Sequence, residues 1–127
     1  MDDPTEPTPA LAASELRTLN NWLGLAMRAG RMRVGSEAAL AAVRARQAQL
    51  VVLAGDAGAN VAKKFRDKCT YYQVPLLRGP DKDMFGRALG RRAVVVAAVL
   101  DAAFAERLRR SLLAIYGGEA FDETEGL

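Results

Sequence analysis

The chain has 127 residues, half of them apolar, which is enough for one domain with a buried core. It contains one cysteine and no histidine. These counts exclude an internal disulfide framework, the usual zinc sites and histidine-based catalytic triads. We therefore expect a single cytoplasmic domain without a metal or cofactor.

Positive charge is concentrated in the middle of the chain. The formal net charge is +3, but residues 1–13 and 117–127 hold seven of the 15 acidic residues and no base. Residues 14–116 therefore contain 18 basic and 8 acidic residues, a surplus of +10. Such a surplus in a compact domain is typical of proteins that bind a polyanion, and nucleic acid is the first candidate.

Membrane association is not expected. No apolar run reaches the roughly 18 residues that a membrane-spanning helix needs. The first residues are acidic and proline-rich, whereas a signal peptide is basic and then apolar. We expect a soluble, unprocessed protein.

The first elements in chain order follow an unstructured start. Residues 1–13 are predicted to form a disordered acidic tail, because three prolines oppose helix formation and little apolar surface is available. Apolar residues at helical spacing predict a first helix over about 14–29, ended by Gly30.

Residues 31–34 then alternate between basic and apolar, which predicts a short strand with one basic face. Gly35 ends this strand. Ser36 is a favourable N-cap for a second helix over about 37–46, and the apolar run 50–54 predicts a strand buried on both faces.

The second half continues to alternate. The patterns predict a helix over about 60–72, a strand over 74–78, a helix capped by Asp81 and ended by Gly90, a strand over 93–100, and a last helix that begins after Asp101 and ends before an acidic tail at 117–127. Four strands alternating with five helices predict an α/β fold, with helices on both faces of a small central sheet. Residues 14–116 form the expected domain.

The junction between the first strand and the second helix offers the clearest binding chemistry. A helix N-terminus has unpaired N–H groups, and Gly35 allows close approach of a phosphate or base. Arg31 and Arg33 can hold phosphates, and the Glu37 carboxylate can accept hydrogen bonds from a guanine edge. Alternatively, Glu37 complements the helix dipole and the arginines are merely solvated.

Two further basic clusters are candidate nucleic-acid contacts. They are Lys63, Lys64, Arg66 and Lys68 on the third predicted helix, and Gly90, Arg91 and Arg92 in a loop. Lys64 and Lys68 repel each other at a spacing of four residues, so an anionic partner would stabilise this helix. Each cluster is also compatible with an ordinary solvated surface.

Enzymatic chemistry has little support. The loop 55–60 lacks the glycine-lysine-serine/threonine ending of a P-loop and the three-glycine spacing of dinucleotide sites. Cys69 falls on the apolar face of its helix, and no pair of carboxylates stands out. We expect a protein that is not an enzyme and has no small-molecule substrate.

Several short motifs occur along the chain in a specific order. They are Leu23-Gly24-Leu25-Ala26 with Arg28-Ala29-Gly30, Gly35-Ser36-Glu37, Leu53-Ala54-Gly55-Asp56, Asp67-Lys68-Cys69 with Tyr71-Tyr72 and Val74-Pro75, and Phe85-Gly86-Arg87-Ala88-Leu89-Gly90. Over residues 16–113 their order and spacing resemble the bacterial YlxQ proteins, a branch of the ribosomal protein L7Ae and L30e superfamily.

This resemblance implies a three-layer α/β/α sandwich with a small mixed sheet. It also implies binding to kink-turn RNA, a sharply bent helix-bulge-helix built on sheared guanine-adenine pairs, by a monomeric, ribosome-associated ribonucleoprotein component. Distorted RNA exposes base edges that a regular duplex hides.

The resemblance further assigns roles to individual residues. Gly35, Ser36 and Glu37 would contact the guanine-adenine pairs; Arg31, Arg33 and Lys82 would hold phosphates; and Gly90, Arg91, Arg92 and Ala93 would cover the bulged bases. The family's recognition helix usually has asparagine before the glutamate and a lysine one turn later, whereas this chain has Ser36 and then Leu40 and Ala41. A base-contacting glutamate of the second loop is replaced by Gly55. These departures predict weaker selectivity and more dependence on arginine and lysine.

Two alternatives stay open. The domain could present RNA to a separate RNA-modifying enzyme, or it could be a protein-interaction module of the same fold. Modules of the second kind work through acidic surfaces, and the surplus of +10 argues against that reading.

Overall fold

The computed structural model describes residues 9–117 and has the predicted five helices and four strands. In chain order they are α1 (Pro9–Arg28), β1 (Met32–Val34), α2 (Ser36–Arg44), β2 (Leu50–Ala54), α3 (Ala59–Tyr72), β3 (Leu76–Gly79), α4 (Lys82–Ala88), β4 (Val96–Val99) and α5 (Ala102–Tyr116).

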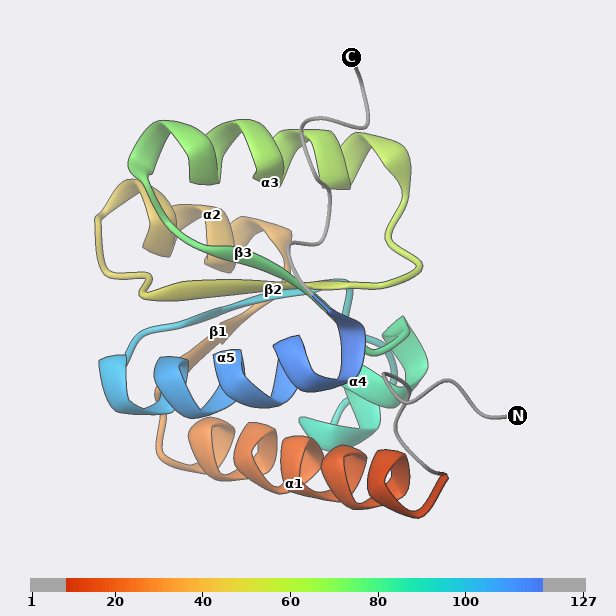
Figure 1. Cartoon of the computed structure of the whole chain (residues 1–127). Helices are drawn as coiled ribbons and strands as arrows, with labels where there is room; N and C mark the ends of the chain where they lie inside the picture. Colours follow the sequence, from red (N-terminus) through yellow and green to blue (C-terminus); the bar gives the residue numbers. More distant parts are fainter. Residues whose placement is uncertain (1–8, 118–127) are drawn as a thin grey trace.

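The four strands form one mixed sheet in the order β1-β4-β2-β3. Strands β2 and β3 are parallel, and β4 is antiparallel to both of its neighbours. Helices α2 and α3 cover one face, and α1, α4 and α5 cover the other (Figure 1). The predicted three-layer α/β/α sandwich is therefore confirmed.

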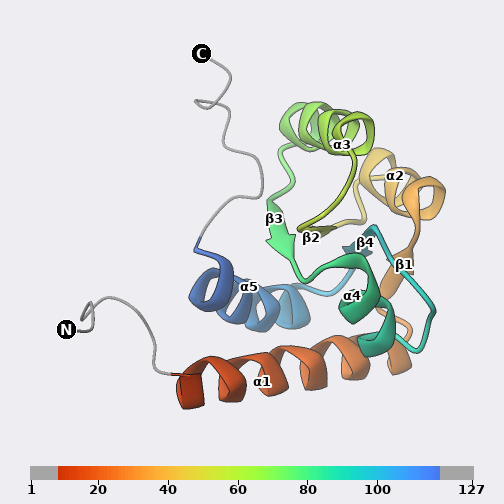
Figure 2. The same cartoon turned by 90° about the vertical axis from the view of Figure 1, so that its right-hand side faces the viewer.

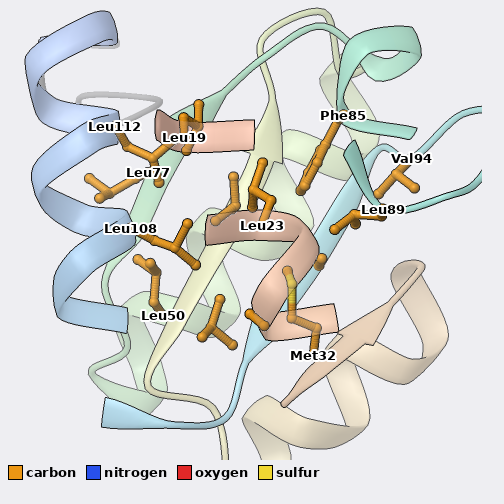
Figure 3. Close-up of a cluster of buried hydrophobic side chains, with 14 of the residues drawn as sticks. Leu19, Leu23, Met32, Leu50, Leu77, Phe85, Leu89, Val94, Leu108 and Leu112 are labelled. Carbon is orange, nitrogen blue, oxygen red and sulfur yellow. The ribbon is translucent and has the colours of Figure 1, made fainter. Parts of the chain in front are cut away.

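The core is divided into two layers by the sheet. Because side chains alternate along a strand, Leu50 and Val52 of β2 pack toward α1 and α5, whereas Val51 and Leu53 pack toward α2 and α3. Figure 3 shows the larger layer, in which Leu23 lies at the centre of the cluster. Within the described residues, no helix is both long and apolar enough to cross a lipid bilayer.

The start of α1 corrects one prediction. The helix begins at Pro9, so residues 9–13 are not part of a loose tail. Proline is tolerated in the first helical turn, where its missing N–H needs no partner, and the following alanines and leucine favour helix. The rest of the predicted N-terminal tail, residues 1–8, and residues 118–127 of the C-terminal tail lie outside the described residues.

Three other boundaries shift for local reasons. Gly35, not Ser36, is the N-cap of α2, because the Gly35 carbonyl accepts the first helical bond from Ala39. Strand β3 begins after Pro75, which has no N–H for the ladder. Strand β4 begins at Val96, and residues 93–95, which the sequence predicts to be part of the strand, lie in the preceding loop.

The turns after β1, β2 and β3 and the loop before β4 lie at the same end of the sheet, because β4 runs antiparallel to β1 and β2. We call residues 35–37, 55–58, 80–82 and 90–95 the loop end. It lies to the right in Figure 1 and faces the viewer in Figure 2.

Candidate nucleic-acid interface

A backbone hydrogen bond joins two of the predicted contact segments. The Gly35 N–H donates to the Val96 carbonyl at 2.9 Å, which brings the start of α2 beside the loop 90–95. Gly35 has φ 99° and ψ 158°, a conformation that residues with a Cβ rarely adopt. The glycine therefore decides how α2 leaves the sheet.

The start of α2 borders a shallow, open depression of about 520 Å³. It is lined by Val34, Gly35, Ser36, Glu37, Ala38 and Ala41. Most of these side chains are small, and no side chain caps the first turn of α2. Free backbone N–H donors and the exposed Glu37 carboxylate thus lie at one site, which can accept from and donate to a base or phosphate.

The loop 90–95 is fixed at both ends while its arginines face solvent. Gly90 has φ 74°, and the Arg91 N–H donates to the Gly86 carbonyl at 2.7 Å, so α4 ends in a Schellman motif. At the other end, the Val94 N–H donates to the Lys82 carbonyl at 3.0 Å. Arg91 and Arg92 are exposed on this rigid backbone.

Asp56 is a positioning residue that sequence reasoning missed. Its Oδ1 accepts from the Lys82 N–H at 2.9 Å, which ties the turn after β2 to the start of α4. An aspartate in a glycine-containing turn is a common signal for such a bond. The 55–60 loop is thus a structural connection that places Lys82.

Arg31 and Arg33 are not brought to the loop end. Arg31 lies at the opposite end of β1, about 13 Å from Gly35 along the strand, and its carbonyl pairs with Leu100. The Arg33 Nη1 donates to the carbonyls of Gly30 and Met32 at 3.3 and 3.1 Å. This guanidinium therefore turns back toward the end of α1.

Lys63 and Lys64 lie one turn into α3, which begins at the loop end. The Lys63 Nζ is 2.8 Å from the Asp67 Oδ2, and this hydrogen bond lowers the pKa of Asp67. Both side chains are exposed, and Asp67 neutralises the charge of Lys63 within the basic cluster. Lys64 is exposed on the same helix.

Cys69 is a buried thiol, and the described residues contain no cluster of metal-ligating side chains. Burial raises the pKa of the Cys69 thiol to about 12, so the thiolate is suppressed at neutral pH. Among residues 9–117, no group of three histidine, cysteine, aspartate or glutamate side chains is placed to hold a metal ion.

Comparison with known proteins places this geometry in a family. Residues 17–109 match the ribosomal protein L7Ae/L30e/S12e/Gadd45 family. A protein named RNA-binding protein YlxQ from Bacillus subtilis (strain 168) is 43% identical over 86 residues, which is 68% of this chain and 86% of the relative. The RNA-binding protein YlxQ of Enterococcus faecium is 35% identical over 89 residues, 70% of this chain and 85% of the relative.

Two solved structures share the fold. A protein with unknown function from Bacillus halodurans C has a TM-score of 0.72 and 39% identity, and the match covers 74% of this chain and 95% of that one. The 15.5kD RNA binding protein of Giardia lamblia has a TM-score of 0.66 and 22% identity, with 91% and 98% covered. The family match and the two YlxQ relatives show that the chain belongs to the ribosomal protein L7Ae/L30e/S12e/Gadd45 family, as a member of the YlxQ type.

Proposed function

We propose that this protein is a non-catalytic RNA-binding protein whose loop end binds a sharply bent, kink-turn-like RNA. The observation that carries the proposal is the hydrogen bond from the Gly35 N–H to the Val96 carbonyl. It places the N-terminus of α2 and the arginine loop 90–95 side by side. One RNA can therefore contact both.

Three further observations support this proposal. The domain carries a surplus of ten positive charges, two relatives are named RNA-binding proteins, and the candidate contacts lie on several different turns at one end of a rigid sheet. Contacts spread over several turns favour a ligand with a defined three-dimensional shape. A bent RNA with exposed base edges has such a shape.

The contacts divide by chemistry. The α2 N-terminus and Glu37 can read exposed base edges, whereas Lys82, Arg91 and Arg92 supply positive charge for the crowded phosphates of a bend. The structure sets Arg31 and Arg33 apart from this group, so we leave them out of the central interface. We further propose that the RNA belongs to the ribosome or to an assembly intermediate of it.

The test compares a kink-turn RNA with a straight duplex of equal length by fluorescence anisotropy at several salt concentrations. The parent protein should prefer the kink-turn. Glu37→Ala should reduce this preference, and Arg91→Ala should weaken both RNAs and flatten the salt dependence by roughly one unit of log-log slope. If both variants bind both RNAs as the parent does, the proposed interface is wrong.

Ribosome association is tested separately. The tagged protein should co-sediment with ribosomal subunits or their precursors in a sucrose gradient at low salt, and Arg91→Ala should move it to the free fraction. A parent protein that stays in the free fraction would contradict the ribosomal part of the proposal and leave RNA binding intact.

A further inference from the structure

Tyr71 is unusually exposed for an aromatic residue. Within the part of the chain that the structure describes, the large apolar side chains in solvent are Leu25, 43% exposed, and Tyr71, 74% exposed. Tyr71 lies in the last turn of α3, about 18 Å along the helix axis from its first residue at the loop end. Most of the Tyr71 ring therefore lies outside the hydrophobic core.

The surroundings of Tyr71 make it more than an isolated surface residue. Its ring packs edge to face on Tyr72 with centroids 4.8 Å apart, and the Arg46 guanidinium lies 5.2 Å from the centre of the Tyr72 ring. Lys68 precedes the two tyrosines by three and four residues, so it lies on the same side of α3. We call Arg46, Lys68, Tyr71 and Tyr72 the tyrosine patch.

The backbone at Arg46 does not favour an arginine. Arg46 has φ 58°, in the left-handed region where a Cβ is disfavoured and glycine is the usual residue. Gln73, just after α3, has the same φ of 58°. What the side chain of Arg46 contributes is a cation held over an aromatic ring, which links the end of α2 to the end of α3.

A line of positive charge leads from the loop end to this patch. Lys64, Lys68 and Tyr71 follow one another at helical spacing and so lie along one face of α3. The single acid of α3 is Asp67, and its Oδ2 is bonded to Lys63. Asp67 lies four residues before Tyr71 and so borders this face, but its charge is balanced by Lys63. Lys64 and Lys68 leave the face with a net positive charge, and it ends at the Tyr71 ring.

We propose that the tyrosine patch is a second RNA-binding site, which stacks unpaired bases of the RNA strand that leaves the loop end. Proteins bind single-stranded nucleic acid by combining a basic track for the backbone with aromatic rings for the bases. Arg46 and Lys68 hold the adjoining phosphates. At about 3.4 Å per stacked nucleotide, roughly five nucleotides span α3. This inference rests on the proposed function.

The test compares two RNAs, a blunt-ended kink-turn and the same kink-turn with ten single-stranded uridines at each end. Fluorescence anisotropy measures the affinity of the protein for each RNA. The extension should raise the affinity of the parent. Tyr71→Ala should remove this gain, by about fivefold or more, and should bind the blunt RNA as the parent does. Tyr71→Phe keeps the ring and should keep the gain.

A matched pair of glycine substitutions distinguishes a loss of the Arg46 charge from an effect on folding. Arg46→Gly and Gln73→Gly both place glycine at a φ of 58°, so each should fold at least as stably as the parent in thermal unfolding. Arg46→Gly should lose part of the gain from the extension, and Gln73→Gly should keep all of it. Equal behaviour of the two variants toward the extended RNA would contradict the role of Arg46.

Failure of this site is distinguishable from failure of the proposed function. A parent that binds both RNAs equally, with Tyr71→Ala unchanged, overturns the second site and leaves the loop end intact. A Tyr71→Ala variant that loses the blunt RNA as strongly as the extended one overturns a single-strand role. A parent that binds neither RNA overturns the proposed function itself.

Discussion

Gly86 in α4 lies directly against the backbone of Ala93. A Cβ at Gly86 would be 2.8 Å from both the Cα and the N of Ala93, and also 2.8 Å from the Arg91 carbonyl oxygen. All three contacts are with backbone atoms, so no change of rotamer relieves them. The loop that carries Arg91 and Arg92 can pack on α4 because residue 86 has no side chain.

Gly86→Ala should therefore displace the arginine loop. We expect the free energy of unfolding to fall by about 1–3 kcal/mol, as for other overpacked sites, and the affinity for kink-turn RNA to fall with it. Chemical denaturation and anisotropy measure the two effects. Gly58→Ala is the control, because its Cβ meets open space at a permitted φ of −65°, and it should change stability by less than about 1 kcal/mol.

Gly35→Ala should strain the backbone where α2 begins. No atom lies within 4 Å of the added Cβ, so the cost arises from the φ of 99° alone and should be about 1–3 kcal/mol. The start of α2 should move and RNA affinity should fall. Gly30→Ala is the matched control, because Gly30 also has a positive φ and open space but lies at the opposite end of β1. Gly30→Ala should lose stability and keep RNA affinity. An equal loss of affinity in Gly35→Ala and Gly30→Ala would argue against RNA binding at the loop end.

The arginines of β1 and of the loop should behave differently. Arg92→Ala should reduce the slope of log affinity against log salt by roughly one unit, because the proposed contact of this exposed side chain with a phosphate is removed. Arg33→Ala should leave the slope unchanged, because hydrogen bonds to the Gly30 and Met32 carbonyls hold its guanidinium away from the loop end. An equal reduction in both variants would show that the interface extends along β1, as the sequence predicts.

Cys69 should be unreactive in the folded protein. Its side chain is 2% exposed and its pKa is raised to about 12, so iodoacetamide should label it slowly at pH 8.5 in buffer and rapidly in denaturant. Rapid labelling of the native protein would show that α3 opens locally.

The same shift predicts a pH dependence of stability. Above pH 9 the unfolded thiol ionises while the buried thiol keeps its proton up to about pH 12, so the native state holds more protons and the free energy of unfolding falls as the pH rises. The stability difference between the parent and Cys69→Ala should therefore shrink between pH 9 and 12. A constant difference would contradict the raised pKa.

Local sequence determined the elements of this protein. Helical spacing, the caps at Asp81 and Asp101 and the apolar runs predicted all five helices and four strands, because these signals depend on neighbours in the chain. Boundaries failed where a backbone conformation or a distant bond decided them, as at Gly35 and at the loop before β4.

The membership of the candidate interface depended on tertiary structure. Sequence proximity grouped Arg31 and Arg33 with Glu37, but an extended strand carries Arg31 about 13 Å from Gly35, and a hydrogen bond turns Arg33 away. Sequence could not show that Asp56 holds Lys82, or that Arg46 lies over Tyr72, because each pair is separated by 26 residues of chain. The sequence by itself determined a basic α/β domain of this family; the pairing of β1 with β4 decided which of its basic residues share one surface, since only strand register and direction bring distant turns together.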